Sequence, residues 1–197
     1  MLRIGAHMSV AGGVSKAVDR AAAHGCEALQ IFTKNGNRWL GKALDPGDVK
    51  RFRARLEETA IRPAVSHASY LINLATEDEP NLNRSIGSLK SALTSCSQLG
   101  IRGVIFHLGS HKGQGLDAVF AQICRACINV LDATADDALL ILENSAGAGG
   151  NIGSKFADCQ SSFRSESFPR ACDIAPVSGA SLTRPSRNLS RPPRRVK

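Results

Sequence analysis

Residues 103–107 read Gly-Val-Ile-Phe-His, a short apolar run that ends in a histidine. Four other short apolar runs occur at intervals of roughly 25 to 40 residues, and longer stretches with helical spacing separate them. Alternation of this kind predicts a βα repeat whose strands form a parallel sheet. The predicted strands are Leu2–Ala6, Ala28–Phe32, Pro63–Val65, Gly103–Phe106 and Ala138–Leu142.

The stretches between these runs carry apolar residues every three or four positions, as on one face of a helix. Gly12 and Gly13 lead into the first stretch, and Pro46, a residue favoured in the first turn of a helix, leads into the second. The pattern predicts four helices, around Val14–Ala21, Val49–Ala60, Leu82–Leu93 and Val119–Val130.

The length of the chain limits the choice of α/β architecture. A closed (β/α)8 barrel needs about 250 residues, whereas this chain has 197. Five βα units fit either a small open sheet or a little over half of a barrel. Because the predicted strands are almost continuously apolar, we expect a sheet that is covered on both faces.

The end of the chain differs in composition from the rest. Residues 157–197 hold eight basic residues against three acidic ones, and five of the eight prolines, in a chain of net charge +8. This Ser/Arg/Pro-rich stretch shows little periodicity, so we expect residues 1–156 to fold and residues 157–197 to form a disordered tail. The tail is either solvated or translated from a shifted reading frame, or it attracts nucleic acid through phosphate contacts.

Other features of the sequence exclude several classes of protein. The chain has no apolar run of eighteen residues and no secretory signal, so we expect a cytoplasmic protein without a membrane span. Its six cysteines are too scattered for a disulfide framework, and Cys124 and Cys127 lie on a helical stripe, which favours packing. Gly147–Gly150 lacks the Lys-Ser/Thr of a phosphate loop, and His24 is expected at the surface.

The residues that follow the apolar runs carry most of the chemical information. Ligands bind at the carboxyl ends of strands in parallel α/β folds, so side chains from these positions should converge on one rim. Imidazole and carboxylate are zinc ligands. A single histidine at a strand end is more often an ordinary rim residue, but four such residues in register with the repeat predict a metal site: His7, His67, His107 and Glu143.

Five segments of the sequence resemble the endonuclease IV family, which is also known as AP endonuclease family 2. They are Ile4-Gly5-Ala6-His7-Met8-Ser9, Phe32-Thr33-Lys34-Asn35, His67-Ala68-Ser69-Tyr70-Leu71-Ile72-Asn73-Leu74, Phe106-His107-Leu108-Gly109-Ser110-His111 and Leu142-Glu143-Asn144-Ser145-Ala146-Gly147. The resemblance implies a TIM barrel that binds three zinc ions. It also implies a base-excision repair enzyme that cuts duplex DNA 5′ to abasic sites and leaves a 3′-hydroxyl.

The resemblance also implies roles for particular residues. His67 and His107 match the histidines that hold one zinc ion, and Glu143 matches the catalytic carboxylate that bridges this ion to a second. Tyr70 and Leu71 match the loop that wedges into the DNA at the lesion. The first DNA-contacting loop contains Lys34, Asn35 and Arg38, with Asn37 at a position that is commonly basic, and His7 and His111 are further rim residues.

The matching segments stop near Phe156. The family's later metal ligands have no counterpart in residues 157–197, so the sequence predicts an incomplete barrel, one zinc ion at most, and impaired activity. The expected partner is double-stranded DNA that contains abasic sites, with no obligate protein partner. Two alternatives remain open, a non-catalytic basic DNA-binding remnant and a TIM-barrel sugar isomerase or epimerase; the protruding Tyr70-Leu71 wedge argues against the second.

Overall fold

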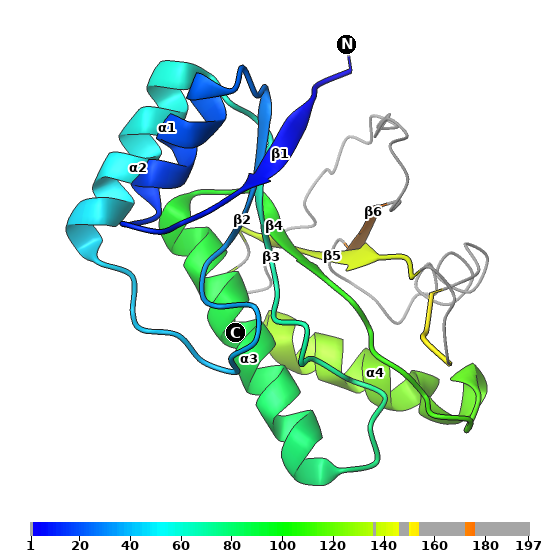
Figure 1. Cartoon of the computed structure of the whole chain (residues 1–197). Coiled ribbons are helices and arrows are strands. Elements are labelled where there is room, and N and C mark those ends of the chain that lie inside the picture. Colours follow the sequence, from blue (N-terminus) through cyan, green and yellow to red (C-terminus); the bar gives the residue numbers. More distant parts are fainter. Residues whose placement is uncertain (1, 136, 146–149, 154–171, 176–197) are drawn as a thin grey trace, which may run out of the picture.

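Strands and helices alternate along the chain in the computed structural model, which describes residues 2–135, 137–145, 150–153 and 172–175 (Figure 1). Each predicted strand and helix has a counterpart in the structure. The elements are β1 Gly5–Met8, α1 Ser15–Ala23, β2 Ala28–Phe32, α2 Pro46–Thr59, β3 Ala64–His67, α3 Glu79–Leu99, β4 Gly103–Phe106, α4 Leu116–Asp132, β5 Leu139–Glu143 and β6 Cys172–Ala175.

The strands form one parallel sheet in the order β1-β2-β3-β4-β5-β6. Consecutive parallel strands joined by right-handed crossovers place the connecting helices on the same face of the sheet. Figure 1 shows α1 to α4 outside the curved sheet, as in the wall of a (β/α)8 barrel. The predicted fold class, an α/β incomplete barrel, is therefore confirmed.

Pairing between strands sets the strand boundaries more strictly than hydropathy does. The prediction of Leu2–Ala6 as the first strand is wrong, because the ladder to β2 runs from Gly5 opposite Ala28 to Met8 opposite Ile31. Leu2 is 59% exposed and lies before the strand. His7 is consequently part of β1 rather than the residue after it.

The two faces of the sheet differ in their cover. In β2, Leu29 and Ile31 are buried against the helices, whereas Gln30 and Phe32 point the other way and are half-buried. All four residues of β1 are at least partly exposed. The expectation of cover on both faces therefore fails at β1 and holds only in part for the inner face of β2 within the described residues.

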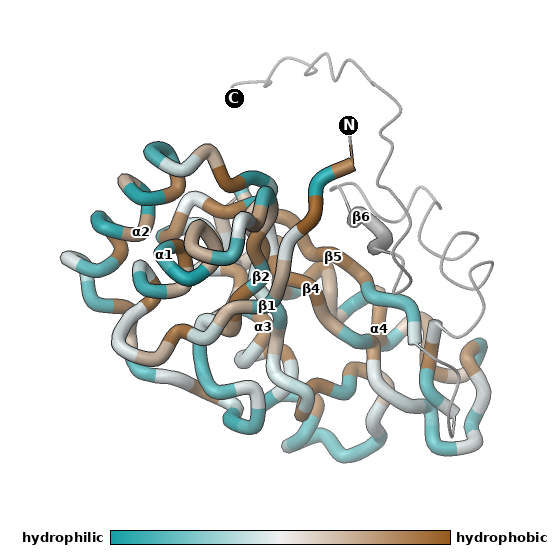
Figure 2. The backbone as a smooth tube through the Cα atoms, turned by 45° about the horizontal axis from the view of Figure 1, so that its top comes forward, coloured by the Kyte–Doolittle hydropathy of each residue, from teal (hydrophilic) through white to brown (hydrophobic). Residues whose placement is uncertain are grey.

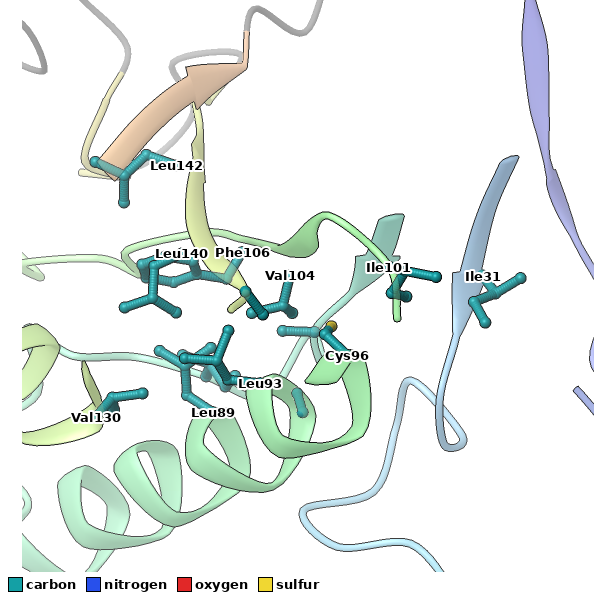
Figure 3. Packing of buried hydrophobic residues seen from close by; sticks show 14 of the residues in the cluster. Ile31, Leu89, Leu93, Cys96, Ile101, Val104, Phe106, Val130, Leu140 and Leu142 are labelled. Carbon is teal, nitrogen blue, oxygen red and sulfur yellow. The ribbon is translucent and has the colours of Figure 1, made fainter. Parts of the chain in front are cut away.

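The core lies between the sheet and its helices. Figure 3 shows Leu89 and Leu93 of α3 packed beneath Val104, Phe106 and Leu140, and all five side chains are fully buried. Coloured by hydropathy, β4 and β5 are largely hydrophobic, whereas the outer turns of α2 are hydrophilic (Figure 2). Among the described residues, no helix has the length and apolarity needed to cross a bilayer.

The sheet extends one strand beyond the five predicted βα units. β6 pairs in parallel with β5, from Cys172 opposite Leu140 to Ala175 opposite Glu143. These four residues lie inside the segment 157–197 that the sequence assigns to the tail. The remainder of that segment lies outside the described residues.

A carboxylate on α2 holds the start of α1. Asp48 Oδ2 accepts a hydrogen bond from the backbone N–H of Val14 at 2.5 Å, and Oδ1 accepts one from the Ser15 hydroxyl at 2.5 Å. Burial raises the pKa of Asp48, but these bonds and the neighbouring Arg51 outweigh burial and bring the pKa below its ordinary value. The ionised carboxylate therefore joins the two helices.

Asp48→Ala is expected to lower the free energy of unfolding by about 2 to 3 kcal/mol, because two buried donors lose a charged acceptor. Since the pKa is lowered by folding, this loss is fully present above the ordinary carboxyl pKa and shrinks as the pH falls through the lowered value. Urea unfolding between pH 2 and pH 7 measures it. Asp117→Ala, which removes an exposed first-turn aspartate of α4, should change the free energy of unfolding little. Equal losses of stability in Asp48→Ala and Asp117→Ala would contradict the prediction.

Candidate metal centre

Three neighbouring strands bring together two imidazoles and a carboxylate. His67 is the last residue of β3, His107 follows β4, and Glu143 ends β5. Their ligand atoms all lie within 4.8 Å of one another. Glu143 Oε2 lies 2.9 Å from His67 Nε2 and 3.4 Å from His107 Nε2. The structure thus brings three of the four predicted strand-end residues to one point on the rim, and His7 lies outside this group.

The hydrogen bonds of His67 match the chemistry of a metal ligand. Its Nδ1–H donates to the carbonyl of Ala68 at 2.8 Å, which orients the ring so that Nε2 faces Glu143. In this structure His67 Nε2 and Glu143 Oε2 are paired by a hydrogen bond of 2.9 Å. A second bond that fixes the tautomer is typical of zinc-bound histidine.

The pKa values of Glu143 and His107 are both lowered within the cluster. The hydrogen bond from His67 lowers the pKa of Glu143; burial opposes this effect, and the charge interactions with His107 and His67 add to it. Burial lowers the pKa of His107 against the raising effect of Glu143. Imidazole nitrogens and a carboxylate oxygen are zinc ligands, so the donor set of His67, His107 and Glu143 fits a zinc ion held by three protein ligands.

The three side chains of the centre differ in their exposure to solvent. The His67 side chain is 7% exposed and that of Glu143 22%, whereas that of His107 is 41% exposed. A large ligand can therefore approach from the side of His107.

Aromatic rings line the centre beside His67. Phe32 contacts His67 with ring centroids 5.6 Å apart, and Tyr70 contacts both rings at 5.4 and 5.5 Å. Tyr70 is nevertheless 60% exposed, and its neighbour Leu71 is 38% exposed. The predicted wedge residues thus protrude directly beside the cluster, and their contact with DNA stays a prediction.

Hydrogen bonds join the rim loops to one another. The carbonyl of Gly36 accepts bonds from Tyr70 N–H and the Ser69 hydroxyl, which ties the loop after β2 to the loop after β3. Asn73 binds both backbone groups of Ser110, at 3.2 Å each, and so ties in the loop after β4.

Sequence reasoning missed Asn73, although it lies in a segment that resembles the family. Its pairing with Ser110 spans 37 residues of sequence, and no local pattern predicts such a contact. A Cβ on Gly109 would lie 2.1 Å from Asn73 Oδ1, so the glycine next to Ser110 makes room for the amide.

Lys34 points at a helix instead of solvent. Its ammonium donates to the Trp39 carbonyl at 2.9 Å and to the carbonyl and hydroxyl of Ser88 at 3.0 and 2.9 Å, which occupies all three of its donors. A contact between Lys34 and DNA remains a prediction that requires these bonds to break. Asn35 and Arg38, by contrast, lie on an exposed turn closed by Arg38 N–H and the Asn35 carbonyl.

Burial lowers the pKa of Lys34 from 10.5 to about 8. Between these two values the unfolded chain binds more protons than the folded chain, so the folded protein should gain stability relative to Lys34→Met as the pH rises from 8 towards 10.5. Urea unfolding of both proteins at pH 7, 8, 9 and 10 measures the gain. In the control Lys42→Met, which changes an exposed lysine of the same loop, the difference in free energy of unfolding from wild type should stay constant over this pH range. A constant difference for Lys34→Met as well would refute the prediction.

The other rim histidines lie outside the cluster. His111 Nδ1 accepts hydrogen bonds from the N–H groups of Gly113 and Gly115, so its ring supports the loop after β4. His7 lies on the inner face of β1, with its ring 4.5 Å from that of Phe32. Cys127 is fully buried on α4 and Cys124 partly buried, as the predicted packing role requires. Gly147–Gly149 lies outside the described residues.

Comparisons with known proteins match the chain to one family model and to several endonucleases. A family model described as a xylose isomerase-like TIM barrel matches residues 18–167, which extends past Phe156. The chain is 38% identical over 167 residues to a probable endonuclease 4 from Geobacter sp. strain M21, covering 84% of this chain and 59% of that protein. It is 41% identical over 162 residues to a probable endonuclease 4 from Halorhodospira halophila, covering 80% of this chain and 54% of that protein.

Two solved structures also superpose on the chain. The crystal structure of endonuclease IV from Thermus thermophilus superposes with a TM-score of 0.77 at 32% identity, covering 89% of this chain and 62% of that one. A 3-keto-D-glucoside 4-epimerase from E. coli superposes with a TM-score of 0.67 at 12% identity, covering 89% of this chain and 68% of that one, and shares the fold alone. The chain spans less than two thirds of the length of these nuclease relatives.

Proposed function

Because the chain belongs to the xylose isomerase-like TIM-barrel family and, within it, to the endonuclease IV family, we propose that it is a zinc-dependent endonuclease. Its substrate is duplex DNA with an abasic site, which it cuts 5′ to the lesion to leave a 3′-hydroxyl. The observation that carries this proposal is the convergence of His67, His107 and Glu143 beside the exposed Tyr70.

His67, His107 and Glu143 would hold a zinc ion beside the phosphate that is cleaved. The bound ion would supply Lewis-acid stabilisation for negative charge on phosphate oxygens. The carbonyl of Ala68 orients the His67 ring for this task. Because His107 is the most exposed of the three side chains, the DNA strand approaches along its side.

The residues around the centre select the lesion. An abasic nucleotide has no base to stack, so it leaves the duplex at low cost, and aromatic or apolar side chains fill the gap. Tyr70 and Leu71 are exposed next to the centre and suit this role. Arg38 and Asn35 on the neighbouring turn contact backbone phosphates, which position the duplex without reading its sequence.

One zinc ion per chain is expected. The described residues form one group of three ligands, whereas a pair of metal ions stabilises both the attacking and the leaving oxygen in phosphoryl transfer. We therefore expect slow nicking by this chain. The basic composition, +8 overall, supports binding to DNA even where cleavage is slow.

The test uses the purified full chain and a fluorescent duplex with one abasic site. We expect about one zinc per chain by plasma mass spectrometry, zinc-dependent nicking at the lesion, extension of the nicked strand by a polymerase, and no cleavage of the undamaged duplex. Binding of DNA without nicking would favour a non-catalytic DNA-binding protein, and absence of both would refute the proposal.

Tyr70→Ala should reduce the preference for the abasic duplex over the intact duplex by about tenfold, since stacking by one aromatic ring contributes roughly 1 to 3 kcal/mol. Fluorescence anisotropy with both duplexes measures this preference. Leu2→Ala removes a side chain of nearly equal exposure, 59% against 60%, and should leave the preference unchanged. An unaltered preference in Tyr70→Ala would show that the wedge lies elsewhere.

A further inference from the structure

His7 carries a defined proton on a ring that faces the candidate metal centre. In the β1–β2 ladder His7 lies opposite Gln30, and the Gln30 amide nitrogen lies 3.0 Å from His7 Nδ1. An amide nitrogen only donates, so Nδ1 accepts and the proton of the neutral ring resides on Nε2. His7 therefore presents a neutral N–H donor.

The position of this donor is set by packing against the metal centre. The His7 ring contacts Phe32 with centroids 4.5 Å apart, and Phe32 in turn contacts His67 at 5.6 Å. Burial and then repulsion from His67 lower the pKa of His7, in accord with a neutral ring. The ring of Phe32 thus lies between His7 and the predicted zinc ligand His67.

Neither the metal cluster nor the core uses the imidazole of His7. The cluster consists of His67, His107 and Glu143, and His7 is an exposed residue of β1. Among the described residues, no hydrogen bond involves Nε2 of His7. A side chain that is oriented by an amide yet exposed on the inner face of the sheet has the properties of a ligand-binding group.

We propose that His7 binds the DNA strand at the metal centre by donating a hydrogen bond from Nε2 to a backbone phosphate oxygen. This inference rests on the proposed function. Phosphate oxygens are the anionic acceptors that a strand cleaved at the centre brings within reach of β1. A neutral donor in this place would bind the phosphate without repelling a zinc ion held by His67, His107 and Glu143.

The binding test uses the full chain and a duplex that contains a tetrahydrofuran abasic analogue, with a chelator present to prevent cleavage. His7→Phe keeps a ring against Phe32 but removes the donor, and it should weaken binding by about tenfold, as expected for a hydrogen bond to a charged group. His7→Gln, which offers an amide donor in its place, should bind within about threefold of wild type. His24→Phe makes the same change at an exposed residue after α1 and should have no effect.

Two further readouts separate a phosphate contact from a merely structural role. Because His7 is neutral, His7→Phe should leave the slope of log Kd against log salt unchanged, whereas Arg38→Gln should reduce the slope by about one. When neutral methylphosphonates replace the phosphates near the lesion one at a time, the effect of His7→Phe should vanish at one position and persist at the others. An effect that persists at every position would overturn the proposal.

The controls distinguish failure of this inference from failure of the proposed function. If wild type has no preference for the abasic duplex, the proposed function fails and this inference fails with it. If wild type binds and His7→Phe binds equally well, only the inference about His7 is wrong. Should His7→Phe not fold, Gln30→Met leaves His7 in place without its oriented proton, and a loss of about threefold is then expected; equal binding by Gln30→Met would overturn the inference.

Discussion

Glu143→Gln is expected to lower the affinity of the protein for zinc by about a hundredfold or more. Loss of an outer partner of a metal ligand already reduces affinity by roughly 10- to 100-fold, and Glu143 is itself the group that both histidines approach. Glutamine has nearly the same size but no charge. Competition with a chromophoric zinc chelator measures the affinity.

The matched control is Glu77→Gln, which makes the same change at an exposed residue outside the cluster. Its zinc affinity should equal that of wild type, and thermal unfolding in a chelator should show that both variants fold. Zinc binding by Glu143→Gln at wild-type strength would mean that the three side chains do not form the metal site, and the proposed nuclease function would lose its chemical basis.

Phe106→Ala is expected to lower the free energy of unfolding by about 3 to 5 kcal/mol. The ring is fully buried and packs with Val104, Leu140 and Leu89 between the sheet and α3 (Figure 3). Its removal loses the transfer free energy of the ring and leaves a cavity that the surrounding strands close only in part. Urea unfolding monitored by circular dichroism measures the change.

Phe106→Leu fills most of the same space and should lose markedly less free energy of unfolding. Leu40→Ala changes a residue that is 65% exposed, and its free energy of unfolding should stay within about 0.5 kcal/mol of wild type. The position of Phe106 directly before His107 adds a second expectation. At temperatures where Phe106→Ala remains folded, zinc affinity should fall much less than in Glu143→Gln. A small change in stability would contradict the assignment of Phe106 to the core.

The metal cluster is an example of what local sequence patterns predict correctly. His67, His107 and Glu143 each follow or end an apolar run, and parallel strands bring such positions to one edge, so the sequence predicts their proximity. The boundaries of β2 and β4 also agree with the apolar runs at Ala28–Phe32 and Gly103–Phe106. These predictions succeed because burial and chain periodicity are properties of neighbouring residues.

Local patterns do not predict the hydrogen-bond partners of single polar side chains. Lys34 belongs to a loop that resembles a DNA-contacting loop, yet its ammonium binds Ser88, which lies 54 residues away in the sequence. Asp48 belongs to one helix and caps another. The packing of helices and strands that are distant in the sequence decides these partners. A buried polar group forms hydrogen bonds with the groups that this packing brings next to it.

The sequence by itself determined the alternation of strands and helices, the parallel sheet, and the rim on which the histidines and the carboxylate meet, because hydrophobic periodicity fixes which face of each element is buried. Only the tertiary structure decided that β1 begins at Gly5, that Asn73 joins two rim loops, and that Gln30 sets the proton of His7. Those features depend on hydrogen bonds between residues far apart in the chain, and their geometry exists only after the strands have paired.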